Sequence, residues 1–195
     1  MMAKRKHNFN AGPSALPLPV LEQVQAELVD FGGHGLSIME MSHRTPQFEE
    51  VLDRARHAVT RLYGIPATHE VLFLQGGASL QFAQVPMNLG SGGAYLDTGT
   101  WSKKALKEAN TVGKGLSVWS SAAAGYNAVP AADEALDVPA DAPYLHYTSN
   151  NTIYGTQYHY RPASPVPLVC DMSSDVLSRP ADISKFGLIY AGAQK

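Results

Sequence analysis

Short apolar runs alternate along this chain with segments of helical periodicity, and this alternation is the strongest constraint on its fold. The runs that favour strands are Glu70–Leu74, Ala94–Asp97, Gly115–Trp119, Tyr144–Tyr147, Pro167–Cys170 and Gly187–Ala191. The segments that favour helices are Pro19–Phe31, Pro46–Tyr63, Leu80–Leu89 and Ser102–Asn110. Strands that alternate with helices predict an α/β domain with a largely parallel sheet. The Ala-, Pro- and Asp-rich stretch Ala122–Ala142 is predicted to be a surface excursion.

Composition is that of an ordinary globular protein, with 45% hydrophobic and 16% charged residues and a formal net charge of −2. This charge indicates neither nucleic acid nor a membrane surface as a partner, and no apolar run is long enough for a membrane span. The basic opening Lys4–His7 is followed by polar residues, so no signal peptide is expected. The single Cys170 lies in an apolar run, which favours a buried thiol in the reducing cytoplasm.

Polar or small residues follow several of the predicted strands, and ligands of open parallel sheets bind at that edge. Gly76–Ser79 lies before a helix and could receive a phosphate, or could simply be a tight turn. Trp101 could cover a flat ring or pack in the core. The run Thr148–Thr152 could bind a cofactor or form a capped loop. Before the second helix, His43 and Arg44 could bind a carboxylate or phosphate, or could be solvated.

Asp171 and Lys195 stand at the ends of the last two predicted strands. A pyridoxal phosphate (PLP) site needs a lysine amine that forms a Schiff base with the aldehyde and a carboxylate that keeps the ring nitrogen protonated. Separately, Asp171 could cap a turn with Ser173 and Ser174, and Lys195 could be a surface lysine. Together with the turn at Gly76–Ser79 and the upstream tryptophan, they favour a PLP site.

Six motifs, in the order in which they occur along the chain, resemble those of the phosphoserine aminotransferases, a PLP-dependent family of class V and fold type I. The resemblance runs from Asn8 to Lys195. The ending Ala191–Lys195 and the Ser42–Arg44 segment separate the chain from cysteine desulfurases, whose lysine typically follows a histidine. The segments that carry the resemblance are Asn8–Pro13, Met39–Arg44, Gln75–Ser79, Gly99–Trp101, Ser149–Ile153 and Tyr190–Lys195.

The resemblance implies a role for particular residues. Lys195 would be the catalytic lysine, and the cofactor would be held by Ala78, Ser79, Trp101, Thr152, Asp171, Gln194 and Lys195. Arg44, His43 and Ala11 would bind the anionic groups of the substrate, with no metal involved. Some family members carry Ser at the position of Ala11, so a contact here must come from the backbone.

The resemblance also implies a reaction and its partners. The amino group of L-glutamate would pass to 3-phosphohydroxypyruvate, giving O-phospho-L-serine and 2-oxoglutarate in serine biosynthesis, with a possible second role in PLP biosynthesis. The enzyme would be a cytoplasmic homodimer whose active sites lie at the subunit interface. Arg44 would reach into the site of the partner subunit.

Members of this family are nearly twice as long as this chain. We therefore expect the chain to be a piece of a longer polypeptide, without the rest of the large domain and the small C-terminal domain. Residues 1–14 are expected to pack on that small domain, and residues 15–195 to form the first part of the large PLP-binding domain.

Two other functions stay open at this point. One is another class V aminotransferase, of the serine– or alanine–glyoxylate type. The other is a non-catalytic α/β module that binds a phosphorylated ligand, since many functions share such sheets.

Overall fold

The computed structural model describes residues 5–195. Within it the chain divides into two compact units, Met1–Leu72 and Phe73–Lys195. No helix in the described part of the chain is long and apolar enough to cross a membrane.

The unit Met1–Leu72 is built around two helices and a short 3₁₀ turn. The helices are α1 (Leu18–Glu27) and α2 (Pro46–Tyr63), and the 3₁₀ turn η1 spans Ile38–Glu40. Helix α2 has the predicted bounds, because Pro46 starts it and Gly64 ends it in the left-handed conformation with φ 58°. Neither α1 nor α2 contains a buried residue.

Helix α1 is shorter than predicted, because residues after Glu27 form a loop. The carboxylate of Asp30 accepts a hydrogen bond from the Gly35 N–H at 2.7 Å. The Phe31 N–H donates to the Leu36 carbonyl at 2.9 Å. These bonds close residues 30–36 into a turn, so the apolar spacing that continues to Phe31 does not extend the helix.

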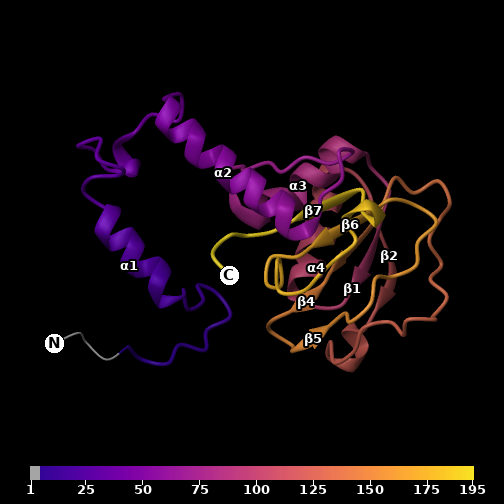
Figure 1. The fold of residues 1–195 in the computed structure, drawn as a ribbon. Helices are drawn as coiled ribbons and strands as arrows, with labels where there is room; N and C mark the ends of the chain where they lie inside the picture. Colours follow the sequence, from indigo (N-terminus) through magenta and orange to yellow (C-terminus); the bar gives the residue numbers. More distant parts are fainter. Residues whose placement is uncertain (1–4) are drawn as a thin grey trace. The chain divides into compact units, whose positions relative to one another are not determined.

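The unit Phe73–Lys195 contains the predicted α/β arrangement, with a five-stranded parallel sheet (Figure 1). The strand order is β2-β1-β3-β6-β7, and every adjacent pair is parallel. The strands are β1 (Gly93–Asp97), β2 (Gly115–Ser120), β3 (Leu145–Thr148), β6 (Leu168–Asp171) and β7 (Leu188–Tyr190). All five lie within a residue or so of predicted runs.

The inner strands β1, β3 and β6 are buried on both faces of the sheet, whereas the edge strand β2 has no buried residue. On one face, helices α3 (Gly77–Leu89) and α4 (Thr100–Val112) pack on Tyr95, Tyr144 and Val169. On the other face, Leu96, Leu145 and Cys170 contact irregular segments.

The stretch Ala122–Ala142 contributes to that second face, so it is more than the surface excursion that composition predicts. It contains the 3₁₀ turn η2 (Ala122–Ala124) and is otherwise irregular. Tyr126 and Ala142 are buried, and Val129 packs against the core. The remaining short elements are the antiparallel pair β4 (Asn150–Asn151) and β5 (Thr156–Gln157) and the 3₁₀ turn η3 (Ile183–Lys185).

The prediction of a strand at Glu70–Leu74 is wrong. These residues are irregular, and no strand in the described part of the chain pairs with them. Leu72, Phe73 and Leu74 are all more than half exposed. An apolar run needs a neighbouring strand to satisfy its backbone N–H and C=O groups, and here it has none to pair with.

A buried polar pair links the middle of the sheet to its last strand. The Nε2 atom of His146 on β3 lies 2.8 Å from the Tyr190 hydroxyl on β7. The His146 ring also stacks on Tyr95, with ring centroids 4.9 Å apart. Burial lowers the pKa of His146 from 6.5 to about 3, because the charged imidazolium loses its hydration.

We predict that His146 makes the protein less stable in acid. Between pH 6.5 and 3 the unfolded chain binds a proton at this residue that the folded chain does not. The free energy of unfolding therefore falls as pH falls through this window. The variant His146→Phe should lose about 1–3 kcal/mol at pH 7.5, because the Tyr190 hydroxyl loses its partner, but should show a flatter decline toward pH 4.5. Urea unfolding of the whole protein at several pH values measures both.

The matched control is Leu145→Ala on the same strand, where the side chain is fully buried. It should lower stability by about 2–5 kcal/mol at every pH and keep the parent's acid dependence. An acid dependence in His146→Phe equal to that of the parent would contradict the assignment.

Candidate functional site

One pocket lies where the carboxyl ends of the central strands meet the N-termini of α3 and α4. Strands β3, β6 and β7 are parallel neighbours, so their carboxyl ends lie at the same edge of the sheet. The residues that line the pocket are Gly76, Gly77, Ala78, Ser79, Phe82, Trp101, Thr148, Asn150, Asp171, Ser173, Ser174, Gln194 and Lys195.

The N-terminus of α3 opens into this pocket. Gly76 is its N-cap with φ 97°, and no side chain in the described part of the chain caps the helix. Ala78 and Ser79 lie in its first turn and line the pocket. A helix N-terminus carries unpaired N–H groups and a partial positive charge, so this end suits an anion.

Trp101 enters the pocket from the start of α4, and Ser102 fixes the turn that carries it. The buried Ser102 hydroxyl oxygen accepts hydrogen bonds from the N–H groups of Thr98 and Gly99, each at 2.9 Å. The buried indole Nε1 of Trp101 has no hydrogen-bond partner within the described structure. The Ser102 bonds therefore fix the turn that carries Trp101, and the indole N–H remains available to a ligand.

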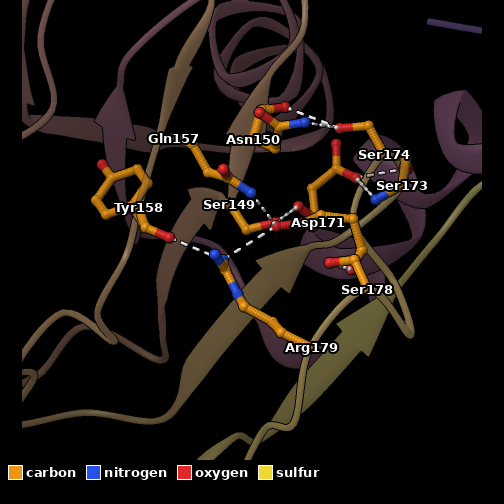
Figure 2. Close-up of polar contacts among 10 residues, drawn as sticks. Ser149, Asn150, Gln157, Tyr158, Asp171, Ser173, Ser174, Ser178 and Arg179 are labelled. Carbon is orange, nitrogen blue, oxygen red and sulfur yellow. Dashed lines mark hydrogen bonds and ion pairs between the residues drawn. The ribbon is translucent and has the colours of Figure 1, made fainter.

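Asp171 ends β6 and is 3% exposed. Its Oδ1 accepts hydrogen bonds from the Ser173 N–H at 3.0 Å and from the Ser173 hydroxyl at 2.6 Å (Figure 2). Burial raises the pKa of this carboxyl, while the Ser173 donors and the Lys195 charge act in the opposite direction. Because burial destabilises its anion, Asp171 is poised to gain from a cationic partner.

Lys195 lies beside Trp101 and Thr152. Its Nζ is 5.1 Å from the Trp101 ring centroid and donates a hydrogen bond to the Thr152 hydroxyl at 3.5 Å. The side chain of Lys104 approaches the same ring, with Nζ at 4.7 Å. The pocket therefore presents an amine next to an aromatic face.

A network behind Asp171 holds the loop that follows β6. The Ser149 hydroxyl lies 2.5 Å from Asp175 Oδ1 and 3.0 Å from the Asp171 carbonyl oxygen. Arg179 makes an ion pair with Asp175 at 3.1 Å and donates to the Tyr158 carbonyl at 2.7 Å. Figure 2 shows Arg179 reaching across this network between Tyr158 and the loop. These bonds hold the loop after β6 to residues Ser149 and Tyr158.

The structure brings most of the residues singled out in the sequence into one place. Thr152 does not line the pocket but touches Lys195. The residues that line it as expected are Ala78, Ser79, Trp101, Asp171, Gln194 and Lys195. The remaining three, Ala11, His43 and Arg44, are exposed residues of the unit Met1–Leu72.

Sequence reasoning missed several pocket residues. Thr148 ends β3 and Asn150 begins β4, and both belong to the polar run Thr148–Thr152, in which the resemblance gives a role to Thr152 alone. The buried Thr148 hydroxyl has no partner among the described residues and sits opposite Asp171 in the β3–β6 register. The sequence alone suggests Ser173 and Ser174 only as partners in a turn with Asp171. Their position directly after a strand end was the available signal.

The sequence matches the family model described as aminotransferase class V over residues 6–195. It is 56% identical to the phosphoserine aminotransferase of Geobacillus kaustophilus (strain HTA426), over 98% of this chain and 54% of that protein. It is 53% identical to the phosphoserine aminotransferase of Phocaeicola vulgatus, over 98% of this chain and 53% of that protein. The chain spans about half the length of the curated relatives it matches.

Solved structures of phosphoserine aminotransferases have the same fold as this chain. A phosphoserine aminotransferase from Bacillus circulans subsp. alkalophilus superposes with a TM-score of 0.93 at 51% identity, over 99% of this chain and 54% of that chain. A PLP-bound phosphoserine aminotransferase from Trichomonas vaginalis superposes with a TM-score of 0.84 at 38% identity, over 98% of this chain and 55% of that chain.

We predict that the turn before α3 tolerates only glycine at position 76. A Cβ at Gly76 would lie 2.8 Å from Leu80 Cβ, in addition to the cost of its positive φ. Gly125 also has a positive φ, but a Cβ there would meet nothing within 4 Å. Both Ala variants should lose about 1–2 kcal/mol from the backbone conformation, and Gly76→Ala should lose about 1–3 kcal/mol more from overpacking.

Urea unfolding of the two variants in the whole protein measures this difference. Equal losses for Gly76→Ala and Gly125→Ala would show that Leu80 gives way and that the turn is not tightly packed.

Proposed function

This chain belongs to the aminotransferase class V family, and from that premise we propose that the whole protein is a PLP-dependent phosphoserine transaminase. It transfers the amino group of L-glutamate to 3-phosphohydroxypyruvate and yields O-phospho-L-serine and 2-oxoglutarate. The observation that carries the proposal is the single pocket in which Asp171, Lys195, Trp101 and the α3 N-terminus converge. The identity of more than 50% to phosphoserine aminotransferases supports it.

The chemistry of the pocket fits PLP. The cofactor combines a dianionic phosphate, a planar ring with a basic nitrogen, and an aldehyde. The pocket offers a helix N-terminus for the anion, a buried carboxylate for the ring nitrogen and an amine for the aldehyde. Two buried polar atoms of the pocket residues, Trp101 Nε1 and Thr148 Oγ1, have no partner among the described residues and could be satisfied by a polar ligand.

We propose the following contacts with the cofactor. Lys195 would attach the cofactor, Asp171 would bind the ring nitrogen, and Trp101 would stack on the ring. Thr152, which already accepts a hydrogen bond from Lys195, would bind near the ring hydroxyl. The phosphate would be held by Ala78, Ser79 and Gln194.

When bound, PLP supplies an electron sink that stabilises negative charge on the substrate α-carbon. The protein contributes the rest. Asp171 would keep the ring nitrogen protonated by offering a buried anion, and the Lys195 amine, which lies beside Trp101, would move the proton at the substrate α-carbon. The ring of Trp101 would exclude water from one side of the reacting atoms.

The anionic groups of the substrate would be bound by Arg44 and His43, with the backbone at Ala11. The planar guanidinium of Arg44 suits a carboxylate or a phosphate. We propose that this happens in a homodimer, with Arg44 serving the site of the partner subunit. Residues 1–14, of which residues 1–4 lie outside the described part of the chain, would pack on the small domain, and residues 15–195 would form the first part of the large domain.

The proposed place of the reaction is serine biosynthesis in the cytoplasm, with a further role in PLP biosynthesis. The free Cys170 is fully buried on β6, which is consistent with a reducing compartment.

We predict that the whole protein prefers a phosphorylated keto acid. With L-glutamate as donor, kcat/KM for 3-phosphohydroxypyruvate should exceed that for hydroxypyruvate or glyoxylate by at least about a hundredfold. A site built to bind a charged group is left with unpaired donors when that group is missing. Initial rates with each acceptor measure the ratio.

Two results would count against the proposal in different ways. A preference for glyoxylate would indicate a transaminase of the serine– or alanine–glyoxylate type. Binding of PLP without turnover of any amino donor would indicate a phospholigand-binding module.

A further inference from the structure

We propose that Ser173 is a positioning residue that fixes the spacing between the Asp171 carboxylate and the turn that carries Lys195. This inference rests on the proposed function, since it gives Ser173 a part in the same site. Ser173 acts through these two residues rather than on the substrate.

The Ser173 hydroxyl joins two segments at once. It donates to Asp171 Oδ1 at 2.6 Å, and its oxygen accepts from the Gly192 N–H at 3.0 Å. A hydroxyl has one donor and two acceptor positions, so both bonds can form together. Asp171 ends β6, and Gly192 begins the turn after β7. In Figure 2 the Ser173 side chain lies directly beside the Asp171 carboxylate.

This bond stands where the next rung of the β6–β7 ladder would be. The last regular rung is the Met172 N–H, which donates to the Tyr190 carbonyl at 2.9 Å. In a regular parallel ladder the Gly192 N–H would next donate to the Met172 carbonyl. That carbonyl instead accepts from the N–H groups of Val176 and Asp175 at 2.9 and 3.2 Å, because the chain turns after β6. The Ser173 hydroxyl replaces it as acceptor and so extends the pairing beyond the sheet.

The turn that this bond holds is close to the N-terminus of α3. Gly192 is buried, and a Cβ there would lie 2.8 Å from Gln194 Oε1 and 3.7 Å from Ala78 Cβ. Lys195 follows three residues later. A shift of the turn would therefore change the approach of its amine to Trp101 and Thr152.

A second serine makes the same local pattern without the bridge. The Ser184 N–H and hydroxyl donate to Asp182 Oδ1 at 3.2 and 2.6 Å, which matches the arrangement of Ser173 with Asp171. Asp182 is exposed, and among the described residues the Ser184 hydroxyl, which lies in η3, bonds to Asp182 and not to a strand. What distinguishes Ser173 is its bond to Gly192 and its buried partner.

Besides fixing its position, the Ser173 hydroxyl stabilises the charged form of Asp171. Burial raises the pKa of Asp171, and the two bonds from Ser173 lower it. The charged groups that face Asp171 are Lys195 from the turn after β7, which lowers the pKa, and Asp175 from the loop after β6, which raises it. The neighbouring Tyr190 and Cys170 stay neutral because burial raises the pKa of each. Without the Ser173 hydroxyl, Asp171 is protonated more readily.

The test compares Ser173→Ala, Ser173→Thr and the matched control Ser184→Ala in the whole protein. The readouts are the dissociation constant of PLP without substrate and the pH midpoint of the acid change in the absorbance of the bound cofactor. Ser173→Ala should weaken PLP binding by about tenfold, the scale of one lost charge-assisted hydrogen bond, and move the midpoint to higher pH. Ser173→Thr should restore both values, and Ser184→Ala should match the parent.

A Ser173→Ala variant that matches the parent in both readouts overturns the inference, as does a Thr variant that behaves like Ala. If Ser173→Ala does not fold, amide hydrogen exchange in the parent protein tests the bond between Gly192 and Ser173. A Gly192 N–H that exchanges as fast as exposed amides would rule out this bond. Failure of the parent itself to bind PLP would instead refute the proposed function.

Discussion

The parallel pairing of β6 with β7 is the constraint on which the site depends. The register sets Asp171 opposite Tyr190, so the residues that follow each strand emerge side by side. Lys195 is only five residues beyond Tyr190 and reaches the same pocket. A slip of one residue would turn Asp171 away from the pocket, because alternate side chains face opposite sides of a sheet. The Ser173–Gly192 bond holds this pairing, and the buried His146–Tyr190 bond ties β7 to β3 across β6.

Several polar groups in the pocket lower the stability of the free protein. The Asp171 carboxylate is destabilised by burial, and Trp101 Nε1 and Thr148 Oγ1 are buried without partners in the described structure. Such groups cost stability in the free protein and return it when a complementary ligand binds. A cationic ring nitrogen beside Asp171 and acceptor atoms beside Trp101 would supply what these groups lack.

Local patterns in the sequence are enough to predict the sheet, because its strands are mostly apolar and are separated by segments rich in glycine and polar residues. The same pattern failed at Glu70–Leu74, since periodicity does not reveal whether a neighbouring strand is there to pair. Asp171 and Lys195 could be predicted from their places at strand ends. Ser173 could not, because its bond to Gly192 exists only once β6 and β7 are paired. The roles of Ala11, His43 and Arg44 stay predictions.

The most direct test of the account is to find which lysine carries PLP. The whole protein would be incubated with PLP, reduced with borohydride and mapped by peptide mass spectrometry. The account predicts a label on Lys195, whose amine contacts Thr152 within the site. A label on Lys104, the other amine near Trp101, or no site-specific label at all would contradict it.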